Sequence, residues 1–286
     1  MKHIIYFFKF LFIIFILTIF KIIGLRLSRI LASKIFSIVG PFFRSKKIIE
    51  KNISYAFHEP DKDFKKNIIN SMWKSYGKIL AEYVFMKYFR KIESKKFLEI
   101  KGQEILEKIK LSKKPVIFVS GHFDNFELMA MTIEKAGINL AAIYRPLNNI
   151  FLNKIMENLR KKYICKNQIK KGRSSVRNLL KLFNDGSSIA LMIDQRVSEG
   201  IKCNFFNKDA LTTTIPAQFV KKFNCKIIPI NIERKENDKF KITVFEPIKF
   251  DKPNDIETIT KTLNLWLEKI IVNNPSKWIW SHDRWK

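Results

Sequence analysis

The chain has 286 residues, enough for one large domain or two small ones and for an ample hydrophobic core. Its formal net charge of +28 at pH 7 favours acidic partners, such as phosphorylated lipids, an anionic membrane face, an acidic protein or nucleic acid. Three cysteines, Cys165, Cys203 and Cys225, are far apart and form no CxxC pair. This spacing argues against a disulfide framework and a metal site, so we interpret them as reduced structural thiols.

The chain begins with a predominantly apolar stretch, Ile4–Ile23, interrupted by Lys9, Thr18 and Lys21. A helix of this length spans roughly 30 Å, the thickness of the hydrocarbon core of a bilayer. The stretch is too long for the apolar region of a signal peptide, and basic sequence follows it instead of a small-residue cleavage site. We therefore expect a membrane helix over residues 1–24, with a buried helical hairpin as the alternative.

Basic residues around this stretch predict its orientation. Few precede it, whereas several follow between Lys21 and Lys47, so the positive-inside rule places the body of the protein in the cytoplasm. An alternative is a helix that lies in one leaflet, because the basic amphipathic stretch Leu25–Ile38 suits a membrane interface.

Residues 25–112 are predicted to be mainly helical, because apolar residues recur there at intervals of three and four. Pro60-Asp61 marks a turn with a helix start after it, and Leu98–Ile100 is a possible short strand. From Lys113 onward, strands alternate with helices. The strands are expected at Val116–Ser120, Leu140–Tyr144, Ser188–Ile193, Lys226–Asn231 and Phe240–Phe245, and the helices at Leu128–Lys135, Asn149–Lys161, Ser174–Phe183, Ile215–Phe223 and Ile256–Val272.

This alternation predicts an α/β fold over residues 113–286, with a mixed, mostly parallel sheet flanked by helices. Together with the membrane helix and the helical region that precedes it, this gives three regions: 1–24, 25–112 and 113–286. No repeat or low-complexity linker separates them.

The octapeptide Ser120–Glu127 lies between an expected buried strand and an expected helix, where open α/β sheets place their chemistry. A neutral imidazole at His122 suits proton abstraction from a hydroxyl near pH 7, and the Glu127 carboxylate can orient it and stabilise the imidazolium. Asp124 is a rival partner for His122. The alternative is a helix-capping network, with Asp124 or Asn125 as the cap and His122 incidental.

Other catalytic motifs are absent from the sequence. There is no GxSxG elbow, no cysteine in the octapeptide, no Walker loop and no GxGxxG, and the other histidines form no metal-spaced cluster with His122. A base without an enzyme nucleophile implies direct attack by a substrate hydroxyl, and hence group transfer in a single displacement.

Two further groups of polar residues follow expected strands. Arg145, in Tyr144-Arg145-Pro146, can bind a phosphate or carboxylate or stabilise an oxyanion, although it could equally be a surface arginine before a turn proline. Asp194 and Gln195 follow another strand, where polar side chains are placed to line a ligand site.

The ordered motifs resemble the late acyltransferases of lipid A biosynthesis (lauroyl and myristoyl transferases), within the wider group of HxxxxD/E lysophospholipid-type acyltransferases. The resemblance covers almost the whole chain, and the blocks in this order and spacing are strongly specific. They are the N-terminal membrane segment, Gly121-His122-Phe123 with Asn125 and Glu127, Tyr144-Arg145-Pro146 with Asn148-Asn149, Lys171-Gly172-Arg173, Asp194-Gln195, Phe205-Phe206 and Pro275–Trp285.

The resemblance implies transfer of a fatty acyl group from acyl carrier protein to a hydroxyl of a Kdo-bearing lipid A precursor. The reaction would take place at the cytoplasmic face of the bacterial inner membrane, without a cofactor or metal. It assigns His122 as general base with Glu127 as its partner. Asn125, Arg145, Asp194 and Gln195 would bind substrate.

The sequence departs from the family pattern at two positions of the octapeptide. Asp124 stands where the family usually has a small residue, and Phe126 where it often has tryptophan. The Asp124 carboxylate would raise the pKa of His122 if it lay close. These changes put the identity of the acceptor in question more than the type of reaction.

Two other functions remain open on sequence alone. The first is acylation of a different membrane lipid, such as a lysophospholipid, a glycolipid or an aminolipid. The second is a membrane-tethered nucleic-acid-binding protein, suggested by the charge, although the lysines are spread over the chain and no recognised reader motif is present. We therefore expect no specific nucleic-acid partner.

Overall fold

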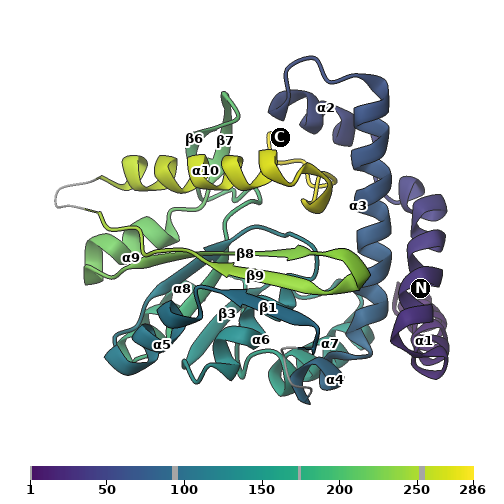
Figure 1. Ribbon diagram of the computed structural model, residues 1–286, viewed down its shortest axis with the longest axis horizontal. Coiled ribbons are helices and arrows are strands. Elements are labelled where there is room, and N and C mark those ends of the chain that lie inside the picture. The colour runs from purple at the N-terminus through teal and green to yellow at the C-terminus, as the bar shows by residue number, and fades with distance from the viewer. Residues whose placement is uncertain (1, 92–95, 173–174, 251–254) are drawn as a thin grey trace.

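A computed structural model describes residues 2–91, 96–172, 175–250 and 255–286 (Figure 1). The first helix, α1 (Lys2–Val39), contains the predicted membrane segment and continues well beyond it. It kinks at Gly24, whose φ of 80° lies in the left-handed region that glycine adopts without strain. Within the described residues, α1 belongs to the one helical stretch, Lys2–Phe42, that is long and apolar enough to cross a membrane.

The expected helical region consists of α2 (Lys46–Ala56), α3 (Lys62–Tyr83) and α4 (Met86–Lys91), followed by β1 (Leu98–Lys101) and α5 (Gln103–Ser112). The predicted helix start after Pro60 is confirmed, because the side chain of Asp61 caps α3 by accepting the Phe64 N–H at 2.6 Å. The long helix α3 runs beside α1 along one side of the molecule (Figure 1).

Seven strands form the main sheet, in the order β1-β9-β8-β2-β5-β3-β4. Every neighbouring pair is parallel except β8 with β9, so the predicted mixed, mostly parallel α/β sheet is confirmed. The strands after β1 are β2 (Ile117–Ser120), β3 (Leu140–Tyr144), β4 (Asn167–Lys170), β5 (Ser188–Met192), β8 (Ile227–Arg234) and β9 (Phe240–Val244).

Helices cover the two faces of this sheet, with α10 on one side and α6 on the other (Figure 1). The central strand β2 is buried along its whole length, as expected of a parallel strand covered by helices on both faces. The helices of this region are α6 (Glu127–Lys135), α7 (Ile150–Tyr163), α8 (Ser175–Asn184), α9 (Ile215–Phe223) and α10 (Ile256–Asn273).

Two features of the sheet region were not predicted. Strand β4 is polar in sequence, and the antiparallel hairpin of β6 (Ile201–Phe205) and β7 (Lys208–Thr212) turns at Phe206 and Asn207 without glycine. Both turn residues have positive φ. The usual sequence signal for such a turn is Asn-Gly, so a turn that begins with phenylalanine is not recognised from the sequence. Arg173, which belongs to the Lys171-Gly172-Arg173 block, and Ser174, the expected start of a helix, lie outside the described residues.

Candidate active site

The site lies at the carboxyl ends of two neighbouring parallel strands. Ser120 at the end of β2 is in register with Met192 at the end of β5. His122 and Asp194 each follow two residues later, so the ladder that joins the strands brings their side chains to the same edge of the sheet. This is the edge at which α/β sheets bind ligands.

Asp194 holds His122 by two hydrogen bonds. Oδ1 of Asp194 lies 2.8 Å from the ring Nδ1, and Oδ2 accepts the backbone N–H of His122 at 2.8 Å. Trp278 donates its indole N–H to the same Oδ2 at 2.9 Å. There is no room for a side chain at Gly121, where a Cβ would lie 2.8 Å from the ring of Phe123 and 3.4 Å from Oδ2 of Asp194. Glycine at that position therefore permits the close packing of Phe123 and Leu267 against the turn.

The two partners stabilise each other's charged forms. Burial alone would raise the pKa of Asp194, but the neighbouring His122 and the N–H donors, Trp278 among them, hold it below its ordinary value. Burial would likewise lower the pKa of His122, but the Asp194 carboxylate, with a smaller contribution from Glu127, raises it above its ordinary value. Asp194 is ionised at neutral pH, and it fixes the ring with its proton on Nδ1 and the lone pair of Nε2 available.

Glu127 is engaged elsewhere. Its Oε1 accepts hydrogen bonds from Nε of Arg160 at 2.8 Å, from Nη2 of Arg160 at 2.5 Å and from the Tyr83 hydroxyl at 2.7 Å. The Arg160 guanidinium also lies 5.5 Å from the ring centre of Tyr144, the tyrosine of the Tyr144-Arg145-Pro146 block. The expected direct pairing of His122 with Glu127 is thus replaced by the His122–Asp194 pair, and Glu127 acts on His122 through its charge.

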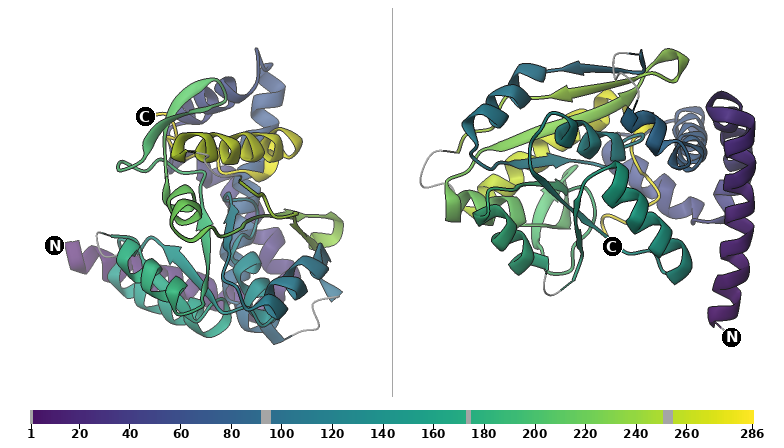
Figure 2. Two further views of the ribbon diagram at one scale, coloured as in Figure 1. Left: turned by 90° about the vertical axis from the view of Figure 1, so that its left-hand side faces the viewer. Right: turned by 90° about the horizontal axis from the view of Figure 1, so that it is seen from below.

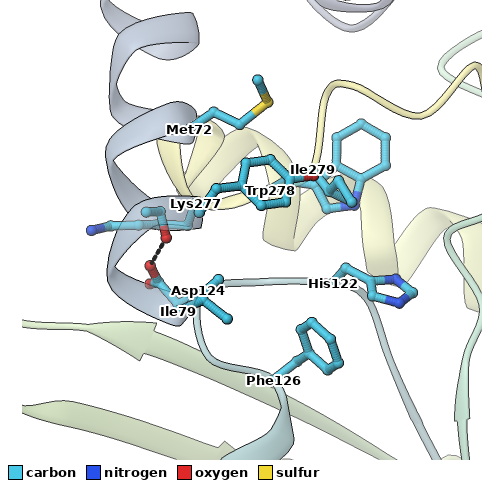
Figure 3. A pocket seen from close by; sticks show the side chains of 10 residues that line it. Met72, Ile79, His122, Asp124, Phe126, Lys277, Trp278 and Ile279 are labelled. Carbon is cyan, nitrogen blue, oxygen red and sulfur yellow. Dashed lines mark hydrogen bonds between the residues drawn. The ribbon is translucent and has the colours of Figure 1, made fainter. Parts of the chain in front are cut away.

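Asp124 points away from His122, as Figure 3 shows. It is buried with a left-handed φ of 35°, and its carboxylate accepts the Ser75 hydroxyl at 3.0 Å and the Arg234 N–H at 2.6 Å. Its own N–H donates to the Lys277 carbonyl at 3.1 Å. The rival pairing of Asp124 with His122 is therefore wrong, and Asp124 instead ties the turn to α3, β8 and the C-terminal segment.

Asn125 also faces the interior. It is fully buried and donates to Oε2 of Glu82 at 2.8 Å. The fully buried Glu82 also binds Arg29 of α1 at 2.6 Å and Arg234 of β8 at 2.6 and 3.1 Å. In this structure the Asn125 side chain therefore makes a structural contact behind the turn that carries His122, and its contact with substrate stays a prediction.

A small pocket opens beside His122, between α3 and the C-terminal segment (Figure 3). Its volume is about 30 Å³, space for one or two water molecules. Much of its lining is apolar and includes Met72, Ile79, Phe126 and Trp278. The Phe126 ring packs edge-to-face on the imidazole, with 4.8 Å between ring centres.

The other predicted site residues flank this centre. Arg145 is exposed and directly follows β3, the strand between β5 and β4 in the sheet. Gln195 is half-buried and directly follows Asp194. Sequence reasoning missed Arg160, Tyr83 and Trp278, which reach the site from α7, α3 and the C-terminal segment. Among the described residues, no group of three or more His, Cys, Asp or Glu side chains could hold a metal ion.

Comparison with known proteins identifies the family. Residues 1–286 match the sequence family described as bacterial lipid A biosynthesis acyltransferase. The chain belongs to this family. It is 21% identical over 260 residues to a lipid A biosynthesis palmitoleoyltransferase of Escherichia coli (strain K12). The aligned residues cover 90% of this chain and 84% of that protein. It is 23% identical over 250 residues to a lipid A biosynthesis lauroyltransferase of the same strain, covering 85% and 79%.

Membership in the lipid A acyltransferase family makes the chain an acyltransferase with a lipid acceptor and a membrane context. The apolar helix α1 is consistent with that context. The positive net charge therefore belongs to an enzyme that acylates a lipid, and it no longer supports the nucleic-acid-binding alternative.

Proposed function

We propose that the chain transfers a fatty acyl group from acyl carrier protein to a hydroxyl of a Kdo-bearing lipid A precursor, with His122 as the general base. The observation that carries this proposal is the hydrogen bond between Nδ1 of His122 and the buried Asp194 carboxylate. It leaves Nε2 with a lone pair, on a side chain that is 21% exposed and therefore open to a substrate.

In the proposed step, Nε2 of His122 removes the proton of the acceptor hydroxyl while the oxygen attacks the thioester carbonyl of the donor. A C–O bond forms and the carbonyl oxygen becomes an oxyanion. When the oxyanion collapses, the C–S bond breaks, and the imidazolium returns the proton to the departing thiolate. Asp194 stabilises the imidazolium in between, and it is a positioning residue because it acts through His122.

Glu127 has a supporting role in this mechanism. Its negative charge adds to that of Asp194 in stabilising the imidazolium, and the Arg160 cation to which it is bound offsets part of this effect. The proposed His122–Glu127 dyad is therefore better described as a His122–Asp194 pair with Glu127 and Arg160 as a second, ion-paired layer.

Substrate binding is assigned to groups at the same edge of the sheet. Arg145 is exposed and is proposed to bind a phosphate of the acceptor or the oxyanion, and Gln195 to contact substrate beside Asp194. The apolar lining of the pocket beside His122 suits an acyl chain, at ~0.8 kcal/mol for each buried methylene. At about 30 Å³ the pocket must widen before a chain enters it, and such widening would set the preferred chain length.

The basic surface supports the choice of donor, since acyl carrier protein is acidic and a net charge of +28 attracts it. The basic residues that follow the apolar stretch of α1 support a catalytic domain on the cytoplasmic face of the inner membrane. The decisive assay offers purified full-length protein a series of acyl carrier proteins of different chain length together with a Kdo-bearing lipid A precursor. Acylated product from one donor class supports the proposal, and absence of transfer with every donor overturns it.

Mass spectrometry of lipid A from a deletion strain tests the acceptor in the cell. The proposal expects loss of one acyl chain, restored by the wild-type gene and not by His122→Ala. An unchanged acyl count would instead direct the search to other membrane lipids, such as lysophospholipids, glycolipids or aminolipids.

A further inference from the structure

The body of the protein contacts α1 along most of its apolar part. Near the N-terminus, Asn149 donates its side-chain amide to the Tyr6 carbonyl at 2.7 Å, and the Phe151 ring lies 5.6 and 5.7 Å from the rings of Phe7 and Phe10. Farther along, Phe20 is buried in a cluster with Ala81 of α3. Tyr6 and Phe20 are about 21 Å apart along a helix axis, at 1.5 Å per residue.

Beyond the kink, the contact becomes tighter. A Cβ at Gly77 of α3 would lie 2.2 Å from the backbone oxygen of Ala32, so the two helix backbones touch. Arg29 of the same segment is bound to the buried Glu82. The second half of α1 is thus fixed to the catalytic body, and the first half continues along the same side of the molecule (Figure 2, right).

The faces of α1 are distinct. The side chains toward the body follow the spacing i, i+4, i+7, i+11 and i+14, whereas the opposite face is apolar and exposed. On that outer face Phe8, Phe12 and Phe15 are each more than 60% exposed. Tyr6, Phe10, Ile13, Leu17 and Phe20 follow this spacing and are buried or half-buried.

An upright helix is incompatible with these contacts. If residues 4–23 crossed the hydrocarbon core, the start of α7 would be held against Tyr6, about 25 Å along the span from Ile23. The exposed Arg145 and Lys154 flank that contact and would have to enter the bilayer, where a charge costs about 2.5–3.5 kcal/mol at the centre. A helix lying along the membrane surface avoids this cost and still places its outer phenylalanines in lipid.

The start of α7 extends the apolar surface. Leu147 and Ile150 are 41% and 51% exposed and adjoin Phe151, which packs on α1. We propose that α1 does not cross the bilayer but lies along the surface of an anionic membrane, with its outer face and the Leu147–Ile150 segment immersed in the same leaflet. Leu147 follows Arg145 by two residues, just beyond the carboxyl end of β3. In this arrangement the edge of the sheet that carries His122 and Asp194 faces the lipid.

The position of the N-terminus tests the proposal. The full chain carries one epitope tag at each end and is expressed into inner-membrane vesicles of inverted orientation, which are then treated with protease. The in-plane helix predicts that both tags are digested together, because both ends lie on one side. Protection of the N-terminal tag while the C-terminal tag is digested would overturn the proposal. Protection of both tags would support the in-plane helix and contradict the cytoplasmic orientation proposed above.

The contact of α7 has a separate test. An environment-insensitive fluorophore is attached to Ile150→Cys or, as a matched control, to Val176→Cys, an exposed apolar position on α8. In anionic vesicles with nitroxide-labelled lipid, we expect at least threefold stronger quenching at position 150, with the unmutated chain giving the background from its native cysteines. Equal quenching at the two positions would refute the contribution of α7 to the membrane surface.

Discussion

Replacing Asp194 by asparagine changes the chemistry of His122 with almost no change in volume. The aspartate offers two acceptor oxygens: Oδ1 to the ring, and Oδ2 to the His122 backbone N–H and the Trp278 indole N–H. Asparagine offers one. If its carbonyl keeps the two N–H donors, its NH₂ group faces Nδ1 and donates to it. The ring proton then moves to Nε2, and the lone pair that should accept the substrate proton is lost.

The same change of tautomer in a serine protease triad lowers kcat about 10⁴-fold. That loss corresponds to about 5.4 kcal/mol of transition-state stabilisation, at 1.36 kcal/mol for each factor of ten. We expect a loss of this order for Asp194→Asn, because Asp194 likewise binds Nδ1 of the histidine. The substitution also removes the charge that raises the pKa of His122, so any residual activity should persist to lower pH than in the wild type.

The assay follows single-turnover acyl transfer from acyl carrier protein to the lipid A precursor by mass spectrometry. Asp185→Asn, in an exposed turn before β5, is the matched control and should retain wild-type turnover. Thermal unfolding of both variants shows whether the fold is preserved. If a folded Asp194→Asn protein kept more than a tenth of the wild-type rate, the assignment of Asp194 as the orienting carboxylate would be refuted.

Further predictions concern the same residues and the buried ion cluster. His122→Ala should lower transfer at least about 100-fold in a protein that stays folded and membrane-bound, and Glu127→Gln should cost less, as rate measurements on both will show. Because the base must be neutral and its pKa is raised, kcat/KM should fall on acidification with a midpoint above 6.5. Glu82→Gln should lower the free energy of unfolding by about 3–5 kcal/mol, since it removes the carboxylate that the buried Arg29 and Arg234 share, whereas Glu99→Gln at an exposed position should change it little in denaturant titrations. Burial opposes the lowered pKa of Glu82, but Arg234, Arg29 and Asn125 outweigh it, so the stability it contributes is present above pH 4.5 and lost as pH falls through the lowered pKa.

The sequence predicts the sheet well where strands are buried and β-branched, as in β2 and β8. It misses β4, whose residues Asn167–Lys170 are largely polar, because the hydrophobic pattern that reports a buried strand is absent there. The kink at Gly24 was also not predicted, whereas the helical continuation of α1 to Val39 agrees with the helical region expected from residue 25 onward.

The site illustrates the same limit at the level of single residues. His122 and Glu127 are neighbours in sequence, which suggested a dyad, whereas Asp194 is 72 residues away from His122. The pairing with Asp194 follows from strand order: once β2 is known to lie beside β5, with Ser120 opposite Met192, the two side chains fall at equivalent positions. Strand order is a property of tertiary packing, and no local pattern in this sequence encodes it.

The buried charges around the turn that carries His122 explain why Asp124 stands where the family usually has a small residue. Arg234 brings a cation into the interior, and a single Glu82 carboxylate must also neutralise Arg29. Asp124 supplies a second anion, with its Oδ1 3.9 Å from Nε of Arg234 and its Oδ2 on the Arg234 backbone N–H. A small residue at this position would leave Arg29 and Arg234 against Glu82 and the half-buried Asp238, whose Oδ1 lies 3.5 Å from Nη1 of Arg234. Asp124 thus supplies a second buried anion to the cluster that joins α1 to the turn carrying His122. Its charge therefore acts on the stability of the turn, and the base is tuned by Asp194 instead.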